Sequence, residues 1–311
     1  MKKILLFLTC ILVVFSLSAC DLLARFGIGE DSAAAYVRCD KSGNADEDGE
    51  YLLFGEYPQS LKAADVEITE SVDERGYYLG SDGAYYAKVL AAAFSDEYTF
   101  SDGSPVTDGE EYYFKVEPIR WRILSADDGV ALILCDSVIS NVAYQASVSK
   151  NGSVCYTSSN GAPSGTYAND YGYSDIRVWL NGEFYEGALS EAQREIVLTT
   201  NVENAGAFGN VEDKIYLLSC EEVSNVDYGF NSSTSEYDGI RRIVVSDYAR
   251  AKGAFMKTVS EYYGNGSWWL RSVDVASNSV FRIDSAGKVD TGYVNRAQYG
   301  VVPALRIDIS K

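Results

Sequence analysis

The chain has 311 residues, carries a formal net charge of −19 at pH 7 and contains no histidine. The lack of histidine excludes the usual general base near neutral pH, the usual zinc ligand and any catalytic pairing of serine or cysteine with histidine. The acidic excess opposes binding to nucleic acid, which is therefore not an expected partner. The length suits one large domain or two small ones; we favour one, because no linker rich in proline, glycine or serine follows residue 50.

The first twenty residues have the pattern of a lipoprotein export signal. Lys2 and Lys3 give a positive start, an apolar run follows from Ile4 to Phe15, and Leu-Ser-Ala precedes Cys20. Such a segment is typical of a cleaved signal and too short for a spanning helix. We expect Cys20 to carry lipid and to hold the protein in the cell envelope, surface-exposed on the outer membrane. The alternatives are an ordinary signal peptide with a chance cysteine, or a membrane anchor.

Residues 21–48 predict a tether between the lipid and a domain that spans residues 49–311. Their side chains are mostly small and polar, and the segment ends in the acidic run Asp46, Glu47 and Asp48. Such a composition buries too little apolar surface to offset the entropy of ordering, so most of the tether is expected to be disordered.

Four cysteines remain in the exported chain, at positions 39, 135, 155 and 220. Four cysteines allow three disulfide pairings in an oxidising compartment. Cys135 and Cys220 each follow an apolar run and are expected in strands as small buried residues. We favour buried free thiols over two disulfides, because the spacing is irregular.

Two β-hairpins are predicted in the first half of the domain. The segment Gly76–Val89 carries paired tyrosines on both sides of Ser81-Asp82-Gly83, which is a turn signal. The runs Arg120–Leu124 and Val130–Cys135 flank Asp127-Asp128-Gly129 and predict the second hairpin.

Three short helices and a later pair of strands complete the expected elements. Ser174 is a plausible N-cap for a helix through Tyr185, Ser190 and Gln193 fit a capping box, and a helix over Ser246–Lys252 should stop at Gly253. Val280–Ile283 and Lys288–Val289 then predict strands around Asp284–Gly287. Short helices with short antiparallel strands indicate an α+β domain.

Adjacent aromatic residues are expected to divide between the core and the surface. The pairs are Tyr77–Tyr78, Tyr85–Tyr86 and Trp268–Trp269. Neighbouring residues of a strand point to opposite faces, so one tyrosine of each pair should pack inward, a role we favour over carbohydrate binding. Likewise one tryptophan should lie in the core, and the other could floor a binding face.

The segment Gly266–Ile307 places a long polar stretch between two apolar ends. The ends contain residues that bury area and fix backbone angles: Trp268, Trp269, Leu270, Arg271, Gly300, Val301, Pro303, Ala304 and Leu305. Between them lie small, hydroxyl, amide, charged and aromatic residues, the types that recognition surfaces use. The segment therefore predicts a fixed frame that carries a contact surface.

This segment and several phrases upstream of it resemble a known group of proteins. The phrases are YLLFGEYPQ from Tyr51, PIRWRIL from Pro118, SDIRVWLNGEFY from Ser174 and KIYLLSCEEV from Lys214. With them, residues 50–311 resemble C-type lectin-like domains of the formylglycine-generating-enzyme type. The pattern GSWWLRS, then G-x-V, then GVVPAL is most similar to the variable proteins of diversity-generating retroelements, of the treponeme variable surface lipoprotein type. That resemblance implies a C-terminal segment that a reverse transcriptase diversifies and that binds ligands.

Ten residues of this segment are the candidates for ligand contact: Trp269, Asp274, Arg282, Asp284, Asp290, Thr291, Tyr293, Asn295, Arg296 and Gln298. Tyr293 and Arg296 are the strongest candidates, because tyrosine and arginine most often anchor interfaces. The alternative is that these are ordinary solvated loop residues.

The expected function is non-covalent binding of a protein or glycan ligand by a monomer, without cofactor, metal or catalysis. Formylglycine-generating enzymes work through cysteines late in the chain, and no cysteine follows Cys220 here. The alternatives are an extracytoplasmic hydrolase with a carboxylate pair, for which acidic residues are plentiful, and a structural envelope lipoprotein without a specific ligand.

Overall fold

The computed structural model describes residues 35–204 and 209–310, and the predicted signal with Cys20 lies outside these residues. Strand β1 (Val37–Cys39) already pairs antiparallel with β2 (Tyr51–Leu61), and the side chain of Cys39 is fully buried. The backbone N–H of Asp48 donates to the side chain of Asp46 at 3.1 Å. The prediction of a tether up to residue 48 is therefore wrong for this part, because the acidic run forms a turn of the folded domain.

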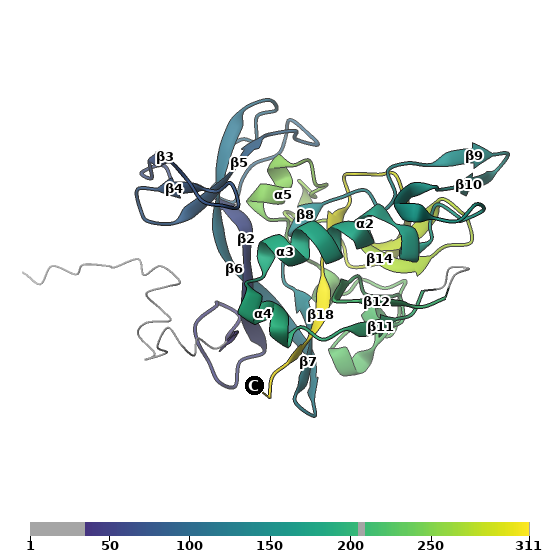
Figure 1. The fold of residues 1–311 in the computed structure, drawn as a ribbon. Coiled ribbons are helices and arrows are strands. Elements are labelled where there is room, and N and C mark those ends of the chain that lie inside the picture. The colour runs from purple at the N-terminus through teal and green to yellow at the C-terminus, as the bar shows by residue number, and fades with distance from the viewer. Residues whose placement is uncertain (1–34, 205–208, 311) are drawn as a thin grey trace, which may run out of the picture. The chain divides into compact units, whose positions relative to one another are not determined.

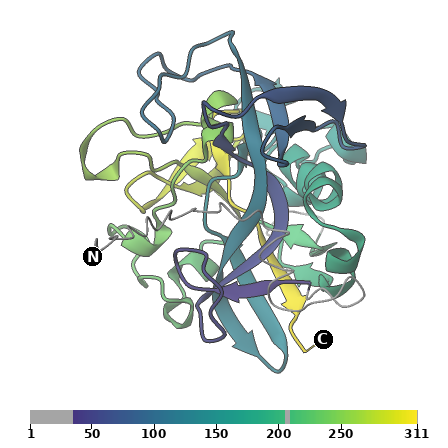
Figure 2. The same cartoon turned by 90° about the vertical axis from the view of Figure 1, so that its left-hand side faces the viewer.

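A large antiparallel sheet forms the first part of the domain, and its neighbouring strands run in the order β13-β18-β7-β6-β5-β4-β3, with β2 also paired to β6 (Figure 1). Its further strands are β3 (Ile68–Val72), β4 (Tyr78–Gly80), β5 (Tyr85–Leu90), β6 (Glu111–Asp127), β7 (Val130–Cys135), β13 (Ile215–Tyr216) and β18 (Ala304–Asp308). The two long strands β2 and β6 run side by side through its middle (Figure 2). The C-terminal strand β18 thus lies next to β7 from the middle of the chain.

Both predicted hairpins are confirmed. Tyr78 pairs with Tyr86 across β4 and β5, and Asp127 pairs with Val130 across β6 and β7. Asp128 and Gly129 both have positive φ, 51° and 77°, as a two-residue type I′ turn requires. Local turn chemistry fixes this register.

A second sheet holds the C-terminal segment, in the order β16-β15-β14-β17-β8. Its strands are β8 (Ser140–Asn141), β14 (Trp268–Val273), β15 (Ser279–Ile283), β16 (Val289–Tyr293) and β17 (Gly300–Val301). The pair β14 and β17 is parallel, with Trp268 opposite Gly300. Two further ribbons are β9 (Ser149–Asn151) with β10 (Val154–Tyr156), and β11 (Thr200–Val202) with β12 (Val211–Asp213).

The predicted helices begin at their expected caps. The Ser174 hydroxyl accepts from Arg177 N–H, and α2 (Asp175–Trp179) continues through the π-helical turn η3 (Leu180–Phe184) into α3 (Tyr185–Ala188). The capping box of Ser190 and Gln193 starts α4 (Glu191–Ile196). Ser246 caps α5 (Asp247–Ala251), after which Gly253 turns the chain with φ +92°.

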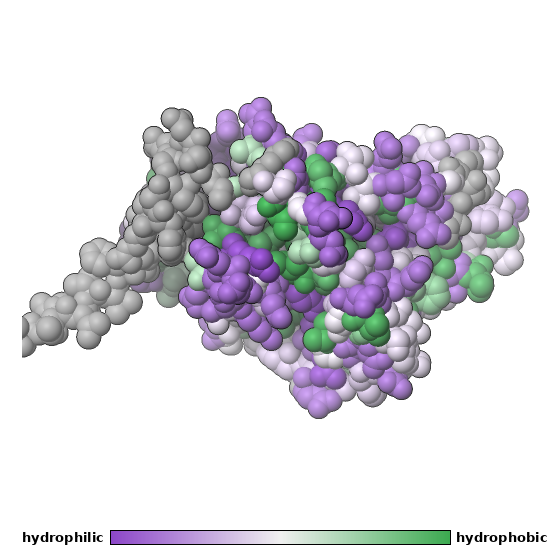
Figure 3. All heavy atoms as spheres, turned by 90° about the horizontal axis from the view of Figure 1, so that it is seen from below, coloured by the Kyte–Doolittle hydropathy of each residue, from purple (hydrophilic) through white to green (hydrophobic). Residues whose placement is uncertain are grey.

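Short 3₁₀ turns connect these elements: η1 (Ser159–Gly161), η2 (Tyr171–Tyr173), η4 (Glu222–Ser224), η5 (Val226–Tyr228), η6 (Gly239–Arg241) and η7 (Ser260–Tyr262). The domain is therefore a sheet-rich α+β fold. No helix in the described part is long and apolar enough to cross a membrane. On the face drawn in Figure 3, hydrophobic side chains are scattered among hydrophilic ones.

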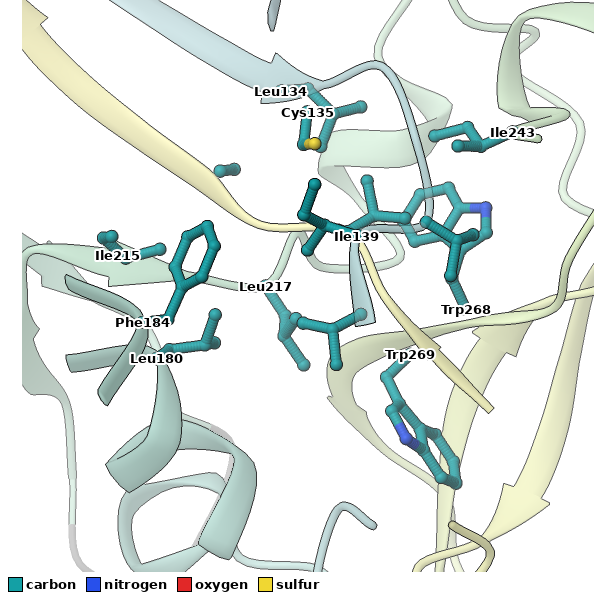
Figure 4. Close-up of a cluster of buried hydrophobic side chains, with 14 of the residues drawn as sticks. Leu134, Cys135, Ile139, Leu180, Phe184, Ile215, Leu217, Ile243, Trp268 and Trp269 are labelled. Atoms are coloured by element: carbon teal, nitrogen blue, oxygen red, sulfur yellow. The ribbon is translucent and has the colours of Figure 1, made fainter. Parts of the chain in front are cut away.

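Trp268 and Trp269 are both fully buried, so the expectation that one of them floors an exposed face is wrong. Their rings point to opposite sides of β14, and Trp268 lies near Ile139 and Ile243 (Figure 4). Each indole N–H donates to a backbone carbonyl, from Trp268 to Arg241 at 3.1 Å and from Trp269 to Val142 at 3.0 Å. Both faces of β14 are covered, because other parts of the chain pack against each side.

The tyrosine pair at β5 divides as expected, since Tyr86 is 1% and Tyr85 38% exposed. Tyr77 and Tyr78 are instead both half-buried. The described cysteines are free thiols, as favoured; Cys39, Cys135 and Cys155 are buried, whereas Cys220 is only half-buried. Burial raises the pKa of Cys135 to about 12. Cys220 lies in a turn after β13 and not in a strand, where its N–H donates to the Ser272 hydroxyl at 2.9 Å.

Candidate functional site

The hairpin of β15 and β16 lies at the edge of the second sheet and brings two loops together. Ser279 pairs with Tyr293 at one end of the hairpin, and Ile283 pairs with Val289 at the other. The loop before β15, residues 274–278, and the loop after β16, residues 294–299, therefore meet at the same end. The sequence spacing alone does not bring these loops together; the antiparallel register does.

A cavity of about 580 Å³ opens where these loops meet. This volume lies in the range of about 300–1,000 Å³ that is usual for small-molecule sites. It is lined by Asp274, Ala276, Ser279, Thr291, Gly292, Tyr293, Arg296, Gln298 and Tyr299. Half of the ten predicted contact residues are among them, and they come from both loops and from β16.

Aromatic packing supports the cavity from beneath. The rings of Trp269 and Tyr299 meet edge to face, with centroids 4.9 Å apart, and the guanidinium of Arg282 lies 4.6 Å from the centroid of Tyr299. The Trp269 ring also packs edge to face against Tyr144, with centroids 5.8 Å apart. Trp269 therefore positions Tyr299, which lines the cavity, and does not itself reach a ligand.

The loop of residues 274–278 is held by one buried side chain. The amide nitrogen of Asn169, which is 5% exposed, donates to the carbonyls of Asp274, Ala276 and Ser279 at 3.3, 3.1 and 3.0 Å. Its own backbone N–H donates to the Ser277 carbonyl at 3.1 Å. Asn169 thus fixes the loop backbone while the Asp274 carboxylate remains at the cavity.

The second loop is fixed in the same manner, through its backbone. Asn141 donates to the Ala297 carbonyl at 3.0 Å, and Phe255 N–H donates to the Gln298 carbonyl at 2.7 Å. The side chains of Tyr293 and Arg296 are exposed, that of Tyr293 by 55%. The backbone is therefore held by the rest of the domain, whereas the side chains of Tyr293 and Arg296 face solvent.

The other predicted contact residues lie outside the cavity. Arg282 and Asp290 form an ion pair across β15 and β16, with side-chain exposures of 13% and 53%. Asp284 accepts from the N–H groups of Ala286 and Lys288, both at 2.9 Å, and so closes the far turn of the hairpin. Asn295 is exposed beside the cavity.

Sequence reasoning missed four residues that line the cavity and three that hold its loops, Asn141, Asn169 and Phe255. Tyr299 is an aromatic residue beside the predicted frame, which is a usable signal. Ala276, Ser279 and Gly292 carry none, because small residues are common in loops and turns. Asn169 lies about a hundred positions upstream, and only the fold brings it to the loop.

The chemistry of the cavity suits recognition. Asp274 is the one carboxylate among the lining residues, so the site lacks the carboxylate pair that glycoside hydrolysis uses. Within residues 35–204 and 209–310, no group of three or more cysteine, aspartate and glutamate side chains could hold a metal ion. Arg296, Gln298, Thr291 and Tyr293 line the cavity with side chains that can form hydrogen bonds.

Fold and site define a class of protein: a sheet-rich α+β domain with an open polar cavity at one end of an edge hairpin. Residues 128–309 match a family described as a domain of unknown function, DUF6273, and because this is more than half of the chain, the chain belongs to that family. Comparisons with curated proteins and with solved structures returned no match. The matched region contains the whole second sheet and every residue that lines the cavity.

Proposed function

We propose that this protein is a surface lipoprotein whose C-terminal segment binds varied protein or glycan ligands through the cavity of Asp274, Tyr293, Arg296 and Gln298. The binding is non-covalent and needs no cofactor. One observation carries the proposal: the loops at this cavity are held through backbone groups by Asn141, Asn169 and Phe255, while the side chains of Tyr293 and Arg296 are exposed. Such a division allows the contact chemistry to change without a change of fold.

The finer parts of this proposal rest on the sequence. The GSWWLRS and GVVPAL phrases that suggest a C-type lectin-like fold and a retroelement-diversified segment form β14 and β17 with their flanks. These are the buried strands that frame the polar stretch. The Leu-Ser-Ala-Cys phrase supports the lipid anchor at Cys20 and thereby display on the envelope surface.

A pair of libraries tests the proposal. In the first, Asp274, Thr291, Tyr293, Arg296 and Gln298 vary together; in the second, Trp268, Leu270, Val301 and Leu305 vary together, all of which are fully buried. Both are displayed, selected for protease resistance, and then panned on an immobilised test protein and on an immobilised polysaccharide.

The first library should remain largely folded and yield different binders for the two targets. The second should lose protease resistance in most members, because buried substitutions cost about 2–5 kcal/mol each. Equal losses of folding in the two libraries would refute the division into frame and contact surface. A genomic search adds an independent test: an adenine-differing copy of the segment beside a reverse transcriptase gene is expected.

A further inference from the structure

A second cavity, of about 920 Å³, shares no lining residue with the candidate site. One wall is formed by residues 75–78 and by β5, and the other by η3 and α3, through Glu183 and Glu186. Tyr57 of β2, Glu111 of β6 and Tyr248 of α5 complete the lining. The first wall precedes the matched family region and the second lies within it.

Four tyrosines, at positions 57, 77, 78 and 248, line this second cavity. The ring of Tyr57, which is 6% exposed, packs edge to face against Tyr248 at 5.5 Å and Phe184 at 5.2 Å. Burial raises the pKa of Tyr57, Tyr77 and Tyr248, and the nearby charge of Glu183 raises each further. The three rings are therefore neutral at physiological pH, and the Glu183 carboxylate is close to all of them.

The charges on the two walls are not balanced. On the first wall each cation already has a carboxylate: Lys88 Nζ lies 2.6 Å from Glu111, and Arg75 Nε lies 3.1 Å from Asp73. On the second wall, Glu183 and Glu186 form no salt bridge with any described residue. Two exposed carboxylates outside any salt bridge of the described residues thus face a tyrosine-lined space whose lining cations, Arg75 and Lys88, are already paired with other carboxylates.

We propose that this second cavity binds a small organic cation with more than one ammonium group, such as a linear polyamine. Neutral aromatic rings attract ammonium groups, and carboxylates add charge-assisted hydrogen bonds. Glu183 and Glu186 are three positions apart on one helical segment, which places their Cβ atoms about 5–6 Å from each other. A ligand with two separated ammonium groups can therefore meet both. The net charge of −19 raises the local concentration of cations.

The test is calorimetric titration of the full chain in detergent with spermidine as the probe. The variant Glu183→Gln with Glu186→Gln should weaken binding at least tenfold, because both carboxylates are lost. The matched control, Glu195→Gln with Glu212→Gln, makes the same charge change at exposed positions outside the cavity and should bind within twofold of the native chain.

A third variant keeps the proposal testable if the double substitution alters folding. Gly187 lines the cavity on α3, and a Cβ there would meet nothing within 4 Å. Gly187→Lys should therefore fold and should abolish spermidine binding, because its own ammonium group occupies the site. Equal weakening by the two glutamine pairs would show mere charge attraction and overturn the proposal. Absence of saturable binding to the native chain, or a Gly187→Lys variant that binds as well as the native chain, would overturn it too.

Discussion

Gly292 lies directly against the ring of Tyr299, so closely that a Cβ on Gly292 would stand 2.7 Å from Tyr299 Cε2 and 3.1 Å from Trp269 Cζ3. Its φ is not positive, so the requirement for glycine here is one of space and not of backbone conformation. The position of the Tyr299 ring in the candidate site depends on this missing side chain.

Gly292→Ala should displace Tyr299 and destabilise the domain by about 1–3 kcal/mol, as overpacking does. Urea denaturation measures the change in the free energy of unfolding. Gly182→Ala is the control, since a Cβ there meets nothing within 4 Å and lies in a helical segment. It should leave stability unchanged or raise it. If both variants have the same free energy of unfolding, the proposed steric requirement for glycine at position 292 is refuted.

Tyr293→Ala and Arg296→Ala should each change stability by only about 0.5 kcal/mol, because both side chains are exposed. Leu305→Ala should cost about 2–5 kcal/mol through a cavity in the core, where Leu305 is fully buried. Thermal melts of the three variants check this. A melt of Tyr293→Ala as early as that of Leu305→Ala would place Tyr293 in the core.

Asn169→Ala should release the loop of residues 274–278, because three backbone carbonyls each lose the bond from the Asn169 amide. A loss of about 1–3 kcal/mol is expected when these buried hydrogen bonds are removed. Hydrogen exchange should become faster at Ser279, whose N–H donates to the Ala276 carbonyl within this loop. Asn295→Ala, at an exposed position, should leave that exchange rate unchanged; unaltered exchange in Asn169→Ala would contradict the anchoring role.

Cys20→Ser should yield a protein that no longer enters the detergent phase on phase separation, because Cys20 is the residue positioned to receive lipid. Cys10→Ser changes a cysteine within the predicted signal and should leave partitioning intact. Detergent partitioning that persists in Cys20→Ser would refute the lipid anchor.

Burial raises the pKa of Glu117 above 4.5, although the Ser60 hydroxyl, which donates to it at 3.0 Å, opposes the shift. A raised folded-state pKa means that the folded state holds the proton more tightly than the unfolded state. The contribution of Glu117 to stability is therefore greatest below the ordinary pKa and falls as pH rises through the folded-state pKa.

Glu117→Gln should accordingly flatten the pH dependence of the urea midpoint between pH 4 and 8, a range set about the ordinary carboxyl value. Ser60→Ala should steepen it, since the stabilising donor is lost. An unaltered profile in both variants would show that Glu117 titrates normally.

The sequence predicts elements whose cause is local. Asp128 and Gly129 specify the β6–β7 turn, and Ser174, Ser190 and Ser246 cap the helices that follow them. Each of these features depends on residues within a few positions of one another, so the pattern in the chain is sufficient.

Features that depend on distant pairing could not be predicted. The burial of Trp269 results from Tyr144 and Tyr299 covering it, and strand alternation alone indicates two faces without saying that both are covered. Asp284 belongs to a polar stretch, but its carboxylate accepts backbone hydrogen bonds within a turn and is not available as predicted for ligand contact. In the same way, residues 37–48 have the composition of a tether, but they belong to the folded domain because Val37–Cys39 pair with the edge of β2.

The parallel contact of Trp268 with Gly300 joins the two ends of the polar stretch at its root. Gly300 N–H also donates to the Ser267 carbonyl at 2.7 Å, so a hydrogen bond joins the last residues of this stretch to the first. Residues 269–299 therefore form a loop-like segment whose two ends are paired with each other. The entropic contribution to the free energy of closing such a loop rises by only about 0.6 kcal/mol for each doubling of its length. A foreign peptide grafted at the tip near Val275, which is fully exposed, should accordingly be carried by this domain as a scaffold at little cost to folding.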